Sequence, residues 1–109
     1  CQAQDCYRDG FKDTGGRNQY MGCTSDSNGQ AGTGTGYAGF RFTGTGVNAD
    51  VQSFDRGGQA WVQDYGIVVS SGATYSYIKG VTKGNSVAGL SSSAPTGSTI
   101  TVVQDAGGK

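Results

Sequence analysis

Apolar and polar residues alternate one by one along several short stretches of this chain. Over residues 37–43, the apolar residues Ala38, Phe40 and Phe42 are separated by single glycine or polar residues. Over residues 47–52, valine and alanine alternate with polar residues in the same way. A period of two is typical of strands with one buried face. Further strands are predicted over 60–69, 73–79, 86–90 and 98–104, with shorter ones at 2–5 and 20–23.

Glycine-containing turns separate these predicted strands. We expect turns at 43–46, 55–58, 71–72 and 83–85, and a bulge at Gly66. Seven or eight short strands with a turn roughly every 8–12 residues predict an antiparallel β-sandwich of the jelly-roll type, without substantial helix. Residues 1–109 form a single domain in this interpretation, with 1–30 as a cysteine-bearing lead-in and 32–64 as its central run of strands.

Composition narrows the choice of function. The chain has 21 glycines without collagen-like spacing, and only 34% of its residues are hydrophobic, so we expect glycine turns around a thin core. A net charge of zero argues against a nucleic-acid or anionic-membrane partner. No apolar run approaches the roughly 20 residues that span a bilayer.

The cysteines lie in the first quarter of the chain, at Cys1, Cys6 and Cys23. In a small, polar, glycine-rich chain they indicate a secreted protein with a disulfide. We expect Cys6 to pair with Cys23. A Cys1–Cys6 pair needs a tight loop, and the third cysteine either pairs between chains or stays free. Because Cys1 is not a translation start, the chain is expected to be processed or a fragment.

The residues that usually carry catalysis are scarce. The chain has no histidine, which removes the commonest general base, and no spacing brings two aspartates together. The glycine-rich segment 32–36 lacks the helix and the Lys-Ser/Thr ending of a phosphate-binding loop. The sequence therefore predicts a protein that is not an enzyme.

Aromatic side chains are the best candidates for binding. Aromatic rings with polar tips suit stacking on sugars or burial in a partner. Alternatively, Trp61 belongs to the core and the tyrosines form a cross-strand ladder. The predicted ligand-binding residues are Tyr37, Trp61, Asp64, Tyr65, Tyr75 and Tyr77.

Several short motifs resemble those of the small β-sandwich carbohydrate-binding modules that hold a structural calcium ion. Residues 2–5 resemble their opening strand, 34–40 are similar to their G-x-G-Y-x-x-F strand, and 75–81 and 96–107 resemble later strands. The resemblance implies a jelly roll that binds polysaccharide, with Tyr37 as a ligand contact. It leaves Asp5 as the calcium ligand, because Gln4 replaces the family's glutamate. It also implies that a closing strand is missing after Gly108.

We therefore expect a secreted, non-catalytic carbohydrate-binding module. The alternative is a structural subunit of an extracellular filament, sheath or capsid surface, assembled through an open sheet edge. A rigid inhibitor or toxin-like domain ranks third, since no segment of the sequence stands out as an inhibitory loop.

Overall fold

Nine strands make up the regular structure of the described residues. The computed structural model describes residues 1–32, 34, 36–57, 60–105 and 107–109. The part of the chain so described is all-β and contains no helix, which confirms that expectation, and it has no helix that could cross a membrane. The strands are β1 (Gln2–Gln4), β2 (Phe11–Asp13), β3 (Gln19–Asp26), β4 (Ala38–Phe42), β5 (Asn48–Phe54), β6 (Tyr65–Val69), β7 (Tyr77–Lys83), β8 (Ala88–Ser92) and β9 (Thr99–Val103).

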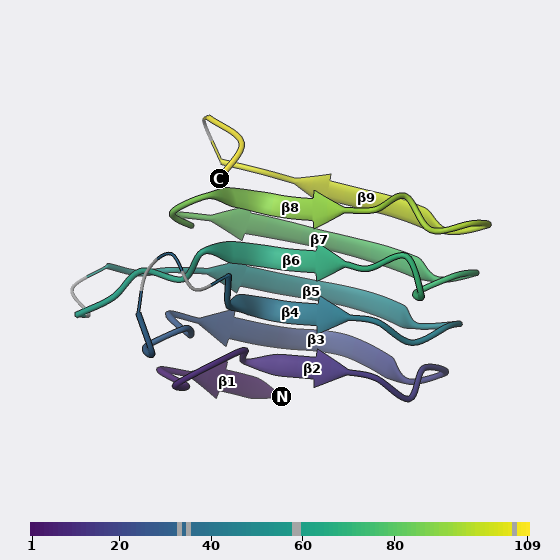
Figure 1. Ribbon diagram of the computed structural model, residues 1–109, viewed down its shortest axis with the longest axis horizontal. Coiled ribbons are helices and arrows are strands. Elements are labelled where there is room, and N and C mark those ends of the chain that lie inside the picture. Colours follow the sequence, from purple (N-terminus) through teal and green to yellow (C-terminus); the bar gives the residue numbers. More distant parts are fainter. Residues whose placement is uncertain (33, 35, 58–59, 106) are drawn as a thin grey trace.

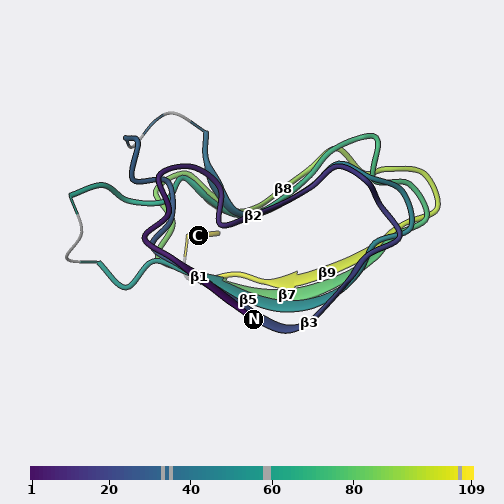
Figure 2. The same ribbon diagram turned by 90° about the horizontal axis from the view of Figure 1, so that it is seen from below.

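The strands form two parallel sheets, and the predicted antiparallel jelly roll is wrong. One sheet has five strands in the order β1-β3-β5-β7-β9, and the other has four in the order β2-β4-β6-β8. Every neighbouring pair in both sheets is parallel. Figure 1 shows the strands stacked as successive coils with the termini at opposite ends of the stack, and Figure 2 shows the two sheets as facing layers. The chain is a two-sheet β-solenoid.

The turns explain the difference. The segment around residues 43–47 does not fold β5 back onto β4, as a hairpin would. It carries the chain from the four-stranded sheet to the five-stranded one, so each strand pairs with the strand two places along the chain. The turn expected at 55–58 also leads between the sheets, although Gly58 lies outside the described residues.

A glycine followed by an apolar residue marks each coil of the four-stranded sheet. Phe11 pairs with Phe40, Phe40 with Ile67, and Ile67 with Leu90. These positions are 29, 27 and 23 residues apart (11 to 40, 40 to 67, 67 to 90). In each case the preceding residue is glycine. This is an internal repeat with one coil per unit, and such repeats are the sequence signature of solenoids.

Apolar side chains fill one part of the space between the sheets. Phe11 stacks on Phe40 with ring centroids 4.7 Å apart, and Phe40 lies 5.9 Å from Phe42. The apolar residues of 38–42 and 47–51 were predicted to face inward. Their side chains are buried, which confirms the prediction. The buried apolar cluster comprises Cys23, Phe40, Phe42, Val47, Ala49, Val51, Ile67, Val69, Ala73 and Ile78.

Polar side chains fill the rest of the interior as a hydrogen-bonded ladder. Gln63 is fully buried; its Oε1 accepts from the backbone N–H of Asn28 (3.2 Å), and its Nε2 donates to Asn85 Oδ1 (2.7 Å). Ser53 Oγ donates to the Gly66 carbonyl oxygen of the facing sheet (2.8 Å). The bonds of Gln63 link successive coils along the solenoid axis, and the bond of Ser53 links the two sheets within one coil.

Glycine is required where the ladder meets the facing sheet. A Cβ atom at Gly39 would overlap Ser53 Oγ and lie 2.9 Å from the Gly66 carbonyl oxygen. At Gly89 a Cβ would overlap Thr82 Oγ1. The glycines therefore allow the two sheets to approach, which a larger residue would prevent.

Some strand boundaries differ from the prediction. Strand β2 was not predicted, because residues 11–13 are too short for a visible alternation. Residues 60–64 precede β6 and are not a strand, and the strand expected over 73–79 lies at 77–83. The bounds of the other predicted strands agree within a few residues.

The disulfide joins Cys1 to Cys23, with Cα atoms 4.6 Å apart, so the predicted Cys6–Cys23 pair is wrong. Parallel pairing of β1 with β3 sets Gln2 beside Thr24, and this brings the preceding residues Cys1 and Cys23 together. Cys6 keeps a half-buried thiol. The closing strand implied after Gly108 belonged to the jelly-roll interpretation, which the parallel sheets contradict.

Candidate functional site: the outer face of the five-stranded sheet

The outer face of the five-stranded sheet carries regular rows of exposed side chains. Alternation along β5 and β7 buries one side chain of each pair and exposes the next. The outer face is defined by the exposed side chains of β3, β5, β7 and β9. They are Gln19, Met21, Asn48, Asp50, Gln52, Tyr77, Lys79, Val81, Lys83, Thr99, Thr101 and Val103.

The parallel register places these side chains in rows across the strands. One row contains Asn48, Tyr77 and Thr99. Because neighbouring parallel strands lie about 4.8 Å apart, each row presents side chains at that interval on a rigid sheet. The next rows are Asp50, Lys79, Thr101 and Gln52, Val81, Val103.

Four exposed apolar side chains lie on this face. The side chains of Met21, Tyr77, Val81 and Val103 lie there and are between 51% and 62% exposed. Val81 and Val103 are direct neighbours in the register. Contiguous exposed apolar side chains rimmed by polar ones are typical of interaction surfaces, so this face is the candidate site.

A shallow cleft lies between β5 and β7 on this face. It has a volume of about 250 Å³ and is lined by Gln52, Ser53, Phe54, Val81, Thr82 and Lys83. Phe54 is half-buried, and Gln52, Val81 and Lys83 are exposed. The cleft thus combines apolar surface with an amide and an ammonium group.

Charges of both signs lie around the cleft. Asp50 pairs with Lys79 in the register, so their charges are neighbours. Among the ion pairs of the described residues, none involves Lys79 or Lys83. Lys83 is therefore the cation at the cleft that has no carboxylate partner within the described structure.

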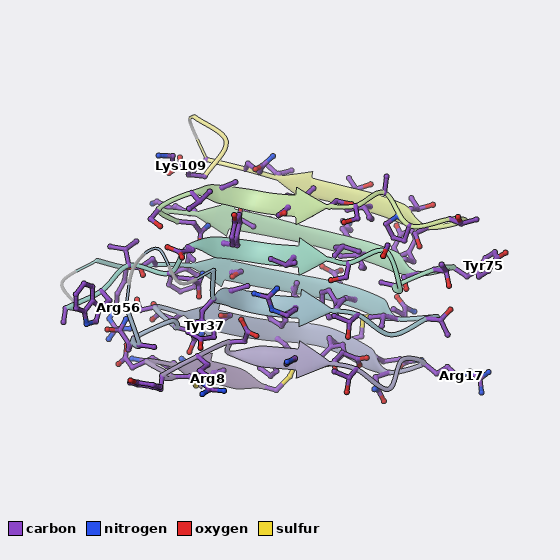
Figure 3. The ribbon with its side chains drawn as sticks, viewed as in Figure 1. Arg8, Arg17, Tyr37, Arg56, Tyr75 and Lys109 are labelled. Atoms are coloured by element: carbon purple, nitrogen blue, oxygen red, sulfur yellow. A yellow bond between two sulfur atoms is a disulfide. The ribbon has the colours of Figure 1, made fainter. Side chains whose placement is uncertain are left out.

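Tyr77 lies on the outer face, but the other predicted aromatic residues do not. Tyr75 precedes β7 in a turn, with a positive φ of 54°, and is 71% exposed. Figure 3 shows Tyr75 at the same edge of the molecule as Arg17, while Tyr37 lies toward the opposite edge with Arg8 and Arg56. The structure thus separates Tyr75 and Tyr77 from Tyr37.

Tyr37, Asp64 and Tyr65 come together at that opposite edge. The backbone N–H groups of Asp64 and Tyr65 both donate to the Tyr37 carbonyl oxygen, each at 3.2 Å. Trp61 lies on the same connection and is 47% exposed, so the alternative that it belongs to the core is wrong. The reason is that residues 60–64 form a loop between the sheets rather than an inward-facing strand.

Asp64 is buried and its carboxylate holds neighbouring loops in place. It accepts hydrogen bonds from the N–H groups of Gly34 (2.9 Å) and Gly36 (2.6 Å) and from Ser86 Oγ (2.6 Å). Burial by itself raises the pKa of Asp64, but the hydrogen bonds from Ser86, Gly34 and Gly36 outweigh it, so the pKa lies below its ordinary value. The carboxylate is engaged by the protein and serves the fold.

A second buried carboxylate, that of Asp13, holds another turn in place through hydrogen bonds. It accepts from Gly16 N–H, Asn18 Nδ2 and Tyr20 Oη, each at 2.7 Å. Burial and the hydrogen bond to Asp13 raise the pKa of Tyr20 to about 12. Burial also raises the pKa of Asp13, but its hydrogen bonds prevail and lower it.

Asp5, the predicted calcium ligand, forms an ion pair with Arg56 at 2.9 Å, and Arg56 also pairs with Asp26 at 2.8 Å. In the described ranges, no three cysteine or acidic side chains gather as a metal site would require. Binding of calcium by Asp5 stays a prediction.

The residues of the cleft were not predicted as site residues. Gln52 was assigned to the polar side of a strand, and Val81 and Lys83 fell outside the strand expected over 73–79. Extending that strand to residue 83 would have placed Val81 and Lys83 on the same face as Tyr77.

No family model, no curated protein and no solved structure matches this chain.

Proposed function

We propose that this protein is a non-catalytic polysaccharide-binding module and that the outer face of the five-stranded sheet is its binding surface. The observation that carries the proposal is the arrangement of exposed apolar and hydrogen-bonding side chains in rows on one rigid sheet.

The chemistry of the rows suits a sugar chain. A pyranose ring has an apolar face that packs on aromatic or aliphatic side chains, and hydroxyl groups that exchange hydrogen bonds with amides and charged groups. Tyr77 and Val81 offer the first kind of contact, and Asn48, Gln52 and Asp50 the second. A polymer of repeated units matches a surface whose side chains stand at regular intervals.

The disulfide supports an extracellular location. Cys1–Cys23 would be reduced in most cytosolic compartments, whereas it persists in oxidising ones, where polysaccharides of cell walls and matrices occur. Secretion is part of the proposal.

Binding is tested by affinity gel electrophoresis against cellulose derivatives, starch, chitosan and polygalacturonate, with and without calcium. We expect retardation by at least one polymer. Tyr77→Ala should weaken it about tenfold, equivalent to about 1.4 kcal/mol. Tyr7→Ala is the matched control, because Tyr7 is 69% exposed in the connection between β1 and β2. No retardation by any polymer would overturn the function, and an unaffected Tyr77→Ala would overturn the assignment of the face.

Assembly through a sheet edge stays a second candidate. Within the described residues, β1 pairs only with β3 and β9 only with β7, so each can accept a further strand on its other side. The edge of β8 is partly covered, since Gly89 N–H donates to the Gly108 carbonyl oxygen (2.8 Å). Sedimentation velocity decides this candidate: a monomer at all concentrations tested would exclude it.

A further inference from the structure

We propose that the cleft between β5 and β7 is the principal subsite of the outer face and that it takes a sugar unit bearing a carboxylate. The ligand is then an acidic polysaccharide. This inference rests on the proposed function and adds the class of ligand to it.

The shape of the cleft matches a single sugar unit. Its volume of about 250 Å³ lies just under the range of about 300–1,000 Å³ that is typical of sites for drug-sized ligands. Phe54 and Val81 provide the apolar surface on which one ring can pack. Gln52 provides an amide at the rim, which can both donate to and accept from sugar hydroxyl groups.

The charge at the cleft selects the kind of sugar. Lys83 lines the cleft, and no carboxylate of the described structure forms an ion pair with it. The nearest acidic side chain in its row is Asp26, across Phe54, and Arg56 already pairs with that carboxylate at 2.8 Å. The ammonium group of Lys83 is therefore available to a carboxylate on the ligand.

The other charges of the face do not cancel this preference. Asp50 and Lys79 are neighbours in the register and carry opposite charges, so together they add no net charge to the face. A neutral sugar would leave Lys83 without a counter-charge, whereas a uronate unit would supply one. Charge complementarity thus favours an acidic polymer over a neutral one of the same backbone.

The test compares polygalacturonate with the neutral polymer made from it by reducing its carboxyl groups. Binding of the intact protein to each is measured by affinity electrophoresis and isothermal titration calorimetry at 20 mM and 300 mM NaCl. We expect the acidic polymer to bind about tenfold more tightly per sugar unit at low salt, and high salt to remove most of this difference.

The variant Lys83→Gln should reduce binding of polygalacturonate about three- to tenfold and reduce binding of the neutral polymer by a smaller factor. Lys12→Gln is the matched control, since Lys12 is exposed on the other sheet and should behave as the wild type. Circular dichroism confirms that both variants are folded.

The outcomes separate the two proposals. Equal binding of both polymers, or an unchanged Lys83→Gln, overturns the acidic subsite and leaves polysaccharide binding standing. Failure to bind these polymers while a neutral polysaccharide of the wider panel binds also overturns the acidic subsite alone. Failure to bind any polysaccharide overturns both.

Discussion

Gln63 Nε2 donates a hydrogen bond of 2.7 Å to Asn85 Oδ1 in the interior between the two sheets. Gln63 Oε1 accepts from the backbone N–H of Asn28 on its other side, at 3.2 Å. One buried amide thus joins three consecutive coils. Replacing it removes bonds that no solvent can replace, because the side chain is fully buried.

The variant Gln63→Leu should therefore be strongly destabilised. We expect the free energy of unfolding to fall by about 2–4 kcal/mol, because Asn28 N–H and Asn85 Oδ1 lose their partner while staying buried. Urea denaturation followed by circular dichroism measures the change. Gln19→Leu, at an exposed position of β3, is the control and should change stability by less than about 0.5 kcal/mol. Equal effects of the two substitutions would contradict the ladder.

The variant Thr82→Val should be as stable as the wild type or more stable, by up to about 1 kcal/mol. Thr82 Oγ1 is buried and has no hydrogen-bond partner, so the isosteric valine removes a desolvated hydroxyl without leaving a cavity. Ser53→Ala is the contrasting variant in the same row, and it should lose about 1 kcal/mol or more, since Ser53 Oγ donates to Gly66. A clear loss of stability in Thr82→Val would contradict the unpaired state of the Thr82 hydroxyl.

Asp64→Asn should make the free energy of unfolding depend less on pH in the acid range. Because the pKa of Asp64 is lowered in the folded state, its stabilising contribution is present above the unfolded value of 3.8 and is lost as pH falls through the folded pKa. We expect the variant to be less stable near pH 7 by about 1–3 kcal/mol and to lose less stability between pH 5 and pH 2. Asp13 retains part of the acid dependence.

Denaturant titrations at several pH values measure the slope of the free energy of unfolding against pH. Asp50→Asn, at an exposed position of β5, is the control and should keep the wild-type slope. If Asp64→Asn also kept the full slope, the hydrogen bonds to Gly34, Gly36 and Ser86 would not control the titration.

Gly39→Ala tests the close approach of the sheets. The new methyl group would overlap Ser53 Oγ and lie 2.9 Å from the Gly66 carbonyl oxygen, so we expect a loss of about 1–3 kcal/mol. Gly15→Ala is the control, because a Cβ at Gly15 meets nothing within 4 Å. Thermal unfolding of both variants gives the comparison, and a Gly39→Ala as stable as Gly15→Ala would refute the contact.

Alkylation without reduction should label Cys6 and leave Cys1 and Cys23 unlabelled. Peptide mass spectrometry identifies the labelled residue after unfolding in denaturant. Cys1→Ser should lower the free energy of unfolding by about 3 kcal/mol, because it opens a loop of 22 residues, whereas Cys6→Ser should have little effect. Alkylation of Cys1 in place of Cys6 would contradict the disulfide.

Period-two alternation in the sequence was sufficient to locate most strands and to assign the buried faces of β4 and β5. Phe40, Phe42 and Val51 face inward because a strand exposes and buries alternate residues whichever way its neighbours run. For the same reason, Tyr77 could be recognised as a candidate contact, although its true neighbours could not.

The direction and partners of the strands depend on tertiary structure. A glycine-rich turn of a few residues serves a hairpin and a solenoid corner equally well, so alternation could not distinguish the antiparallel sandwich from the parallel coil. The Cys1–Cys23 pair, the Gln63 ladder and the cleft beside Lys83 all join residues from different coils, and they exist only once the parallel register is set. The recurring glycine before Phe11, Phe40, Ile67 and Leu90 was the signal of that register in the sequence, since only glycine lets the facing sheets approach at each coil.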